Sequence, residues 1–461
     1  MKKLFSISLE EKKFISLCYF FSSFEGSVTL YTGKAEDEDS SYLFLFPTKV
    51  STLQTEKTLA SSIKESRNSP TKNPFDHLQE DLNFGEEDFI EWVGFLPYEL
   101  GGYSDRDKTF KKHSTTLPLY YFQKSAFTIQ FKHGKNQATV FFDPLAEAFL
   151  TSEEKKWQKK LLDKQFFQDF TQGLKPLNRK KITSSISYRE SKRNYLAKIQ
   201  KIQEEIEEGN VYQANLSHEM VFQMDTSPKD LFFLMLEEHK APFSALFCLR
   251  EYQILSLSPE RFLKKEGEKL VTMPIKGTIQ RGLTKEKDQQ YLQALLSSEK
   301  DRAELLMITD LLRNDLSKIS QIGSVKVDEL FAYKGFSNVW HLFSKIQSIA
   351  LLDKHPIEII RALFPGGSIT GCPKLSAQKI IEELEDRPRG IYTGSIGYFK
   401  NNGDFDFNIA IRTLLSQESH HSLGLGGAIV IDSEKEKEYA ETYHKGASFF
   451  KGLGLQWEDI F

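Results

Sequence analysis

The chain of 461 residues has few cysteines, no long apolar segment and little net charge. Its three cysteines (Cys18, Cys248 and Cys372) are odd in number and widely spaced, which argues against a disulfide framework and a cysteine zinc site. The net charge of −3 gives no sign of a nucleic-acid binder. The apolar run "FISLCYFFSSF" is too short to span a bilayer, and Glu10 and Glu11 interrupt any signal-peptide pattern. We therefore expect a cytoplasmic protein.

The length suggests two to three domain-sized units or one large compound domain. Residues 1–175 contain short β-rich segments such as "SVTLYT" and "YLFLF", and the polar stretch over 53–85 is expected to be a loop. A stretch with Gly, Pro, Asn and Ser but no periodicity, over 171–187, predicts a boundary. Residues 188–457 alternate strands with helices. We predict an α+β fold with largely antiparallel sheets, in which both regions pack into one compound domain.

The stretch "VTMPIKGT" holds a single amine, Lys276, at the end of a predicted strand. Pro274 fixes one backbone angle and Gly277 frees another. Lys276 could be a nucleophile, an anion ligand or an ordinary solvated lysine. Glu260, in "SPERF", is expected near the end of a strand that pairs with the strand of Lys276. There it could form a salt bridge or act as a general acid.

The last predicted helix carries carboxylates on one face. Ser433 and Glu436 predict a capping box that opens it. Glu434, Glu438 and Glu441 follow at i, i+4 and i+7. They form either a solvated face paired with neighbouring lysines or part of a Mg²⁺ site, because hard oxygen ligands suit that ion.

A partner carboxylate for such a site is Glu304, which lies among apolar residues of a helix predicted over about 285–318. A carboxylate in apolar surroundings is costly unless it is paired or binds a metal. The alternative is a salt bridge between Glu304 and Lys300 or Arg302.

The loop "FPGGSITGCPK" has two glycines, Gly366 and Gly371, at the spacing of a nucleotide-binding loop. The next two residues are Cys372 and Pro373 instead of Lys and Ser or Thr, so that match fails. The loop remains a Gly-rich turn before a helix, which suits an anion or tight packing.

Arg412, in "FNIAIRTL", is predicted in a strand with apolar neighbours, where it would pair with an acid or with a substrate carboxylate. Gly426 and Gly427 allow a ligand to approach the backbone closely. Together these residues suggest a pocket for a small dianion, with a metal for one carboxylate and Arg412 for the other.

Six segments occur in order over about 190–455: "PIKGT", "DRAELLMITDLLRNDLSKI", "FPGGSITGCPKLSAQKIIEELE", "GSIGYF", "IAIRTL" and "IDSEKEKEYAETYHKG". They resemble the chorismate-binding enzymes, a family that includes anthranilate, aminodeoxychorismate, isochorismate and salicylate synthases. The N-terminal third resembles the family more weakly, through "VGFLPYELGGY". The resemblance implies an antiparallel β-sandwich core flanked by helices.

The resemblance also implies a site. Mg²⁺ would be held by Glu304 and Glu441 and would bridge to the ring carboxylate of chorismate, with Glu438 nearby. Arg412 and Tyr392 would hold the pyruvyl carboxylate. Further residues would line the pocket through backbone or side-chain groups: Gly277, Thr278, His341, Gly426, Gly427 and Lys445.

Lys276 separates members of the family. The matching residue is typically alanine in anthranilate synthases and lysine in aminodeoxychorismate synthases. The resemblance implies that Lys276 attacks ring C2 and expels the 4-hydroxyl, which Glu260 protonates, before ammonia attacks C4 and expels the lysine. The water-adding family members carry a lysine base where this chain has Gln213, which counts against them. The chain also has Ala428 where a third glycine is expected.

The resemblance therefore favours an aminodeoxychorismate synthase component I on the route to 4-aminobenzoate and folate. We expect a separate glutamine amidotransferase to supply ammonia, because the chain shows no reactive-cysteine elbow of its own. Anthranilate synthase component I and a non-catalytic chorismate-binding protein are the alternatives.

Overall fold

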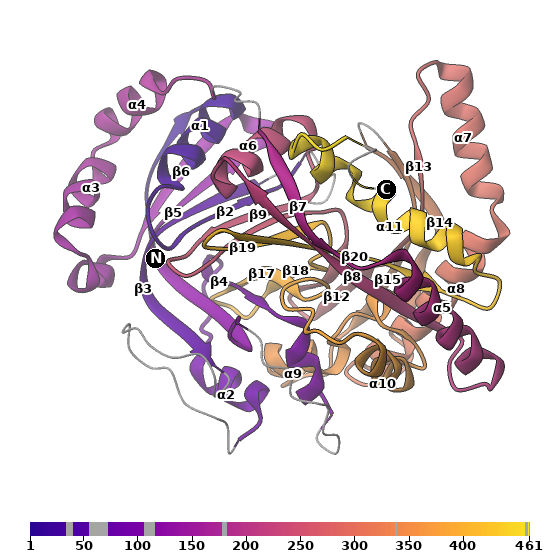
Figure 1. Cartoon of the computed structure of the whole chain (residues 1–461). Coiled ribbons are helices and arrows are strands. Elements are labelled where there is room, and N and C mark those ends of the chain that lie inside the picture. The colour runs from indigo at the N-terminus through magenta and orange to yellow at the C-terminus, as the bar shows by residue number, and fades with distance from the viewer. Residues whose placement is uncertain are drawn as a thin grey trace.

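The computed structural model describes residues 1–33, 40–54, 72–105, 116–177, 182–336, 339–456 and 460 (Figure 1). The strands are β1 (Lys2–Ser8), β2 (Ser27–Tyr31), β3 (Ser40–Leu53), β4 (Ile90–Leu96), β5 (Tyr120–Lys132), β6 (Gln137–Phe142), β7 (Ser184–Arg189), β8 (Gln213–Met224), β9 (Phe243–Cys248), β10 (Gln253–Ser258), β11 (Arg261–Glu266), β12 (Lys269–Met273), β13 (Ile275–Gln280), β14 (Lys326–Gly335), β15 (Val339–Ile349), β16 (Gly371–Cys372), β17 (Ser395–Lys400), β18 (Phe405–Asn408), β19 (Thr413–Gln417) and β20 (His420–Ile429).

The α-helices are α1 (Glu11–Phe21), α2 (Pro74–Asp81), α3 (Ser152–Leu162), α4 (Lys164–Gly173), α5 (Lys192–Glu207), α6 (Pro228–Glu238), α7 (Lys285–Ser297), α8 (Glu299–Ser317), α9 (Pro356–Leu363), α10 (Lys374–Leu384) and α11 (Lys435–Gly452). Short 3-10 helices are η1 (Tyr98–Tyr103), η2 (His133–Lys135), η3 (Pro144–Phe149) and η4 (Gly367–Ile369).

Every strand pair among the described residues is antiparallel. One continuous path of pairings runs β7, β8, β20, β19, β10, β9, β2, β3, β5, β4, β17, β18, β11, β12, β15 and β14. The pairings β2–β9 and β4–β17 join strands of residues 1–175 to strands of residues 188–457. Residues 178–181, within the predicted boundary, lie outside the described part of the chain.

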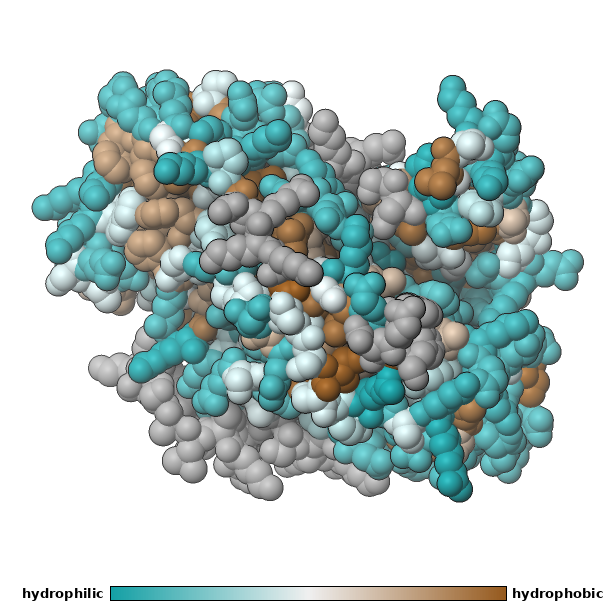
Figure 2. Space-filling model, turned by 45° about the horizontal axis from the view of Figure 1, so that its top comes forward, coloured by the Kyte–Doolittle hydropathy of each residue, from teal (hydrophilic) through white to brown (hydrophobic). Residues whose placement is uncertain are grey.

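The long sheet encloses separate apolar clusters. One contains Phe14, Phe127 and Tyr443, and another contains Trp92 and Leu312. Helices lie outside the strands, with α3 and α4 at one end and α7, α8 and α11 at the other (Figure 1). Figure 2 shows a face on which hydrophilic residues predominate and hydrophobic ones form small groups. The predicted fold, with antiparallel sheets flanked by helices, is confirmed.

Two predicted element boundaries are wrong. The helix expected over 285–318 is two helices, α7 and α8, because Ser298 interrupts it and caps α8 by accepting a hydrogen bond from the backbone N–H of Asp301 at 3.3 Å. The expected loop over 53–85 contains α2, which starts after Asn73, whose side chain accepts from the backbone N–H of Phe75. Residues 55–71 of that stretch lie outside the described ranges.

Candidate active site

A β-bulge sets the position of Lys276. Pro274 separates β12 from β13, and the register of β13 with β15 shifts between Lys276 and Thr278. Gly277 is the extra residue and has a φ of +73°, which favours glycine. A methyl group there would lie 2.9 Å from Leu295 and 3.0 Å from Asp301. The bulge therefore packs directly against α7 and the first turn of α8, and its backbone conformation favours glycine.

This packing brings Lys276 to Glu304, which lies one turn after Asp301 on α8. The Lys276 Nζ is 3.7 Å from the Glu304 Oε2, and the two side chains are 12% and 13% exposed. Burial raises the pKa of Glu304, and the nearby Lys276 and Lys300 ammonium groups oppose that rise. The structure thus brings two predicted site residues together. The Lys300 Nζ is 3.9 Å from the Glu304 Oε1, in agreement with the predicted alternative of a salt bridge between these residues.

Glu260 lies in the turn between β10 and β11 and is buried. The prediction that its strand pairs with that of Lys276 is wrong: β11 pairs with β12 and β18, whereas β13 pairs with β15. The two residues are close nonetheless, because β12 and β13 are consecutive along β15. Burial raises the pKa of Glu260 to about 7, against the opposing effects of Ser368, Lys276 and the backbone of Ile275. At neutral pH the carboxyl is therefore poised to give or take a proton.

Ser368 was not predicted as a site residue. Its hydroxyl donates to the Glu260 Oε1 at 2.5 Å, and both side chains are buried. Ser368 comes from η4 in the Gly-rich loop. The Gly-rich loop, which was expected to suit an anion or tight packing, thus contributes a side-chain hydroxyl to a protein carboxylate.

The α11 carboxylates have different surroundings. Glu438 is buried and accepts from Ser433 Oγ and Lys300 Nζ, both at 2.8 Å. Glu441 is 2.8 Å from Lys445, and these two side chains are 47% and 43% exposed. The Lys445 ammonium lowers the pKa of Glu441. Both Glu438 and Glu441 thus belong to a lysine-rich cluster.

The first turn of α11 differs from the prediction. The helix starts after Glu434, whose side chain makes no capping bond and instead pairs with Lys437 at the surface. Ser433 does not form the predicted capping box with Glu436, because its hydroxyl donates to Glu438 and accepts from the backbone N–H of Val430. Glu434 therefore lies outside the site.

The carboxylates fit a hard cation by chemistry, since Mg²⁺ needs only one or two protein carboxylates together with waters. Within the described ranges, no group of three or more His, Cys, Asp or Glu side chains is arranged to hold a metal ion. Glu304, Glu438 and Glu441 are instead neutralised by lysines. The assignment of Mg²⁺ to Glu304 and Glu441 stays a prediction.

Arg412 does not lie in a strand as predicted. The chain leaves the sheet after Asn408, where the backbone N–H of Ile411 donates to the carbonyl of Ile409, and Arg412 follows with a φ of +50° before β19. In the part of the chain that the structure describes, the Arg412 guanidinium has no ion pair and no hydrogen bond. Burial lowers its pKa. A partly buried arginine in this state is suited to bind an anion.

His341 lies within the electrostatic reach of Arg412 and contacts Thr278. The Thr278 Oγ1 and the His341 Nδ1 are 2.7 Å apart, and His341 is buried. Burial lowers the pKa of His341 to about 3, and the Arg412 charge adds to that effect. His341 is therefore neutral at physiological pH and can exchange hydrogen bonds without carrying charge.

Glycines of β20 make room for Tyr392 and for the lysine cluster. A methyl group on Gly426 would lie 2.9 Å from the Tyr392 hydroxyl, whereas one on Gly427 would lie 3.4 Å from the Lys445 Nζ. Because side chains alternate along a strand, Ala428 shares the face of Gly426 and Tyr392. The Lys445 Nζ also donates to the Gly426 carbonyl at 3.3 Å.

Gln213 starts β8 and is fully buried, and neither polar atom of its side chain has a hydrogen-bond partner. An uncharged amide here supplies no base.

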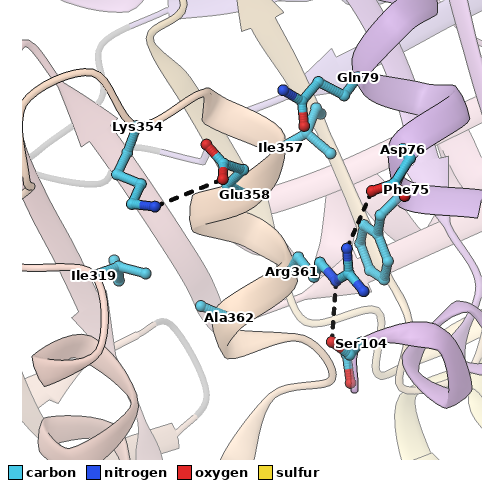
Figure 3. A pocket seen from close by; sticks show the side chains of 10 residues that line it. All are labelled: Phe75, Asp76, Gln79, Ser104, Ile319, Lys354, Ile357, Glu358, Arg361 and Ala362. Atoms are coloured by element: carbon cyan, nitrogen blue, oxygen red, sulfur yellow. Dashed lines mark hydrogen bonds and ion pairs between the residues drawn. The ribbon is translucent and has the colours of Figure 1, made fainter. Parts of the chain in front are cut away.

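Two further observations concern parts of the molecule outside the site. A separate cavity of about 300 Å³ lies between α2 and α9 (Figure 3). There Arg361 donates to Asp76 Oδ1 at 3.2 Å and to the Ser104 carbonyl at 3.0 Å, so its guanidinium already has protein partners.

No helix in the described ranges is both long and apolar enough to cross a membrane.

The sequence profile of the chorismate binding enzyme family matches residues 27–451. The chain belongs to the chorismate-binding enzymes. Aminodeoxychorismate synthase component 1 of Escherichia coli is 32% identical over 440 residues, which cover 93% of each chain. The protein of the same name from Bacillus subtilis is 33% identical over 379 residues, covering 80% of this chain and 77% of that protein. The predicted family membership is confirmed.

Solved structures of other chorismate-binding enzymes share the fold. Anthranilate synthase component I from Streptococcus pneumoniae superimposes with a TM-score of 0.74 at 24% identity, covering 90% of this chain and 93% of that one. The menaquinone-specific isochorismate synthase from Escherichia coli gives a TM-score of 0.71 at 16% identity, covering 97% and 94%.

Proposed function

We propose that this chorismate-binding enzyme is an aminodeoxychorismate synthase component I, which converts chorismate and ammonia into 4-amino-4-deoxychorismate for 4-aminobenzoate and folate synthesis. The observation that carries the proposal is the position of Lys276, a scarcely exposed amine beside Glu304 and within the electrostatic reach of Glu260. The names of relatives that match most of the chain support the same activity.

Chorismate carries two carboxylates, and the site has a cationic group for each. Arg412 and Tyr392 are proposed to bind the pyruvyl carboxylate, because the Arg412 guanidinium is not engaged by any acid in the described ranges. Glu304 and Glu441 are proposed to hold Mg²⁺, which when bound would pair with the ring carboxylate and make the ring a better electrophile. The neutral His341 with Thr278, and the backbone of Gly277, Gly426 and Gly427, would line the space between, with Lys445 at its edge.

The chemistry is proposed in two displacements. Lys276 loses its ammonium proton to solvent and attacks ring C2 as the free amine, the ring double bonds shift, and the C4–O bond breaks as Glu260 protonates the departing hydroxyl to give water. Ammonia then attacks C4, the double bonds shift back, and the bond from C2 to the lysine nitrogen breaks. Glu260 accepts a proton in this second half, so both the carboxyl and the amine return to their starting state.

The nucleophile in the second step is ammonia. Gln213 has no basic atom, which supports amination over hydration. We propose that a separate glutamine amidotransferase delivers the ammonia, since the relatives are named as component 1. We also propose that the protein works in the cytoplasm, and that residues 1–175 and 188–457 form the N-terminal and catalytic regions of one compound domain.

The test incubates the purified chain with chorismate, Mg²⁺ and ammonium at alkaline pH and identifies the product by mass spectrometry and fluorescence. The proposal predicts non-fluorescent aminodeoxychorismate. Fluorescent anthranilate would indicate an anthranilate synthase, and bound but unconsumed chorismate would indicate a non-catalytic protein. Efficient use of glutamine by the isolated chain would contradict the separate amidotransferase.

A further inference from the structure

Lys300 has no part in the proposed chemistry, yet its ammonium lies beside Glu304, a proposed metal ligand, and beside Glu438. Its Nζ donates to Glu438 Oε1 at 2.8 Å and lies 3.9 Å from Glu304 Oε1. The residue is in the first turn of α8, whereas Glu438 is in the first turn of α11. The Lys300 ammonium therefore joins the two helices that supply the carboxylates.

The charges of this cluster balance without a metal ion. Three glutamates (Glu304, Glu438 and Glu441) face three lysines (Lys276, Lys300 and Lys445), and each glutamate lies within 4 Å of a lysine nitrogen. A divalent cation added to the same oxygens would be repelled by an ammonium group already bound to them. Lys276 also acts electrostatically on Glu260, and Lys445 also donates a hydrogen bond to the Gly426 carbonyl.

Lys300 has an open route away from the carboxylates, because its side chain is 48% exposed, whereas that of Lys276 is 12% exposed. The Lys445 side chain is 43% exposed, but its ammonium is held by both Glu441 and the Gly426 carbonyl. Glu438 is nearly inaccessible, at 4%, and keeps a second donor in Ser433. Lys300 can therefore swing into solvent and leave the glutamates in place.

We infer that the Lys300 ammonium is a tethered cation that pairs with Glu304 and Glu438 when Mg²⁺ is absent, and that Mg²⁺ must displace it to bind. Lys300 thereby raises the Mg²⁺ concentration at which the site fills, and it keeps α8 and α11 together while the site is empty of metal. This inference rests on the proposed assignment of Mg²⁺ to Glu304 and Glu441.

The experiment titrates the full chain, stripped of metal with a chelator and then dialysed, with MgCl₂ in a calorimeter without chorismate. Lys300→Met should bind Mg²⁺ at least about tenfold more tightly than wild type. Lys300→Arg keeps the charge and should stay close to wild type. Lys192→Met is the matched control, because Lys192 pairs with Glu436 on the exposed side of the same α11 helix.

Thermal unfolding in chelator and in MgCl₂ supplies a second readout. Lys300→Met should melt at a lower temperature than wild type in chelator, because the glutamates then repel one another, and Mg²⁺ should restore more stability to it than to wild type. Unchanged or weaker Mg²⁺ binding by Lys300→Met would overturn the inference while leaving the proposed function intact. Absence of Mg²⁺ binding by both proteins would overturn the inference together with the magnesium assignment.

Discussion

Replacing Ser368 by alanine should shift the pH dependence of the reaction. The Ser368 hydroxyl donates a 2.5 Å hydrogen bond to Glu260, whose pKa is about 7. A hydrogen bond to a charged group contributes about 1.5–3 kcal/mol when it is buried. Because about 1.4 kcal/mol corresponds to one pKa unit, the bond lowers the pKa of Glu260 by about one to two units.

The direction of the shift follows from which form the bond stabilises. Ser368 favours the ionised carboxylate, so its removal raises the pKa of Glu260 from about 7 by about one to two units. Glu260 must be protonated to protonate the departing hydroxyl, and it loses that proton as the pH rises through its pKa. The alkaline limb of the pH profile in Ser368→Ala should therefore move to higher pH by the same one to two units.

The assay measures kcat/KM for chorismate against pH, with the concentration of free ammonia held constant at every pH. Ser368→Thr keeps the hydroxyl and should retain the wild-type profile. An alkaline limb that does not move in Ser368→Ala, with activity still measurable, would refute the role given to Glu260 as the proton donor.

Three further predictions concern Arg412, Gly277 and two buried histidines. Arg412→Gln should raise the KM for chorismate on the order of 10- to 100-fold, because it removes a charge-assisted contact to one carboxylate; an unchanged KM would contradict that contact. Gly277→Ala should lower the free energy of unfolding in urea by at least about 1–2 kcal/mol, because alanine is strained at a φ of +73°, and equal stability would contradict the bulge geometry. Burial lowers the pKa of both His218 and His341 to about 3. Because the unfolded chain binds these protons near pH 6.5, the free energy of unfolding should fall by about 1.4 kcal/mol per pH unit for each histidine below that pH. The melting temperature should therefore drop steeply from pH 7 to 5, and an unchanged melting temperature would contradict the buried neutral state of the two histidines.

The sequence was sufficient for the fold class, and it named most of the residues proposed for the site. Two local patterns named four of these residues. An amine held between Pro and Gly indicated Lys276, and carboxylates among apolar residues or stacked on one helix face, which are costly unless they are paired or bind a metal, indicated Glu304, Glu438 and Glu441. The structure brings them together through the packing of β13 on α8 and the facing first turns of α8 and α11. The resemblance of ordered segments supplied the rest of the pocket.

Other features depend on contacts between distant segments, which periodicity does not report. The hydrogen bond from Ser368 to Glu260 spans 108 residues, and that from Lys300 to Glu438 spans 138. The apolar neighbours of Arg412 predict a strand, but the chain turns out of the sheet there, and Arg412 has a positive φ. Local sequence patterns therefore indicate which side chains carry chemical groups. The turns and long-range hydrogen bonds that set their positions and pKa values are known only from the three-dimensional structure.

The most direct test of the central claim asks whether Lys276 bonds to the substrate. Wild type and Lys276→Ala are incubated with chorismate and Mg²⁺ without ammonia, and then digested and analysed by mass spectrometry. In wild type, a peptide containing Lys276 should be heavier by the mass of chorismate minus one water, and the variant should show no such adduct. An adduct on another residue, or one that persists in Lys276→Ala, would exclude Lys276 as the nucleophile.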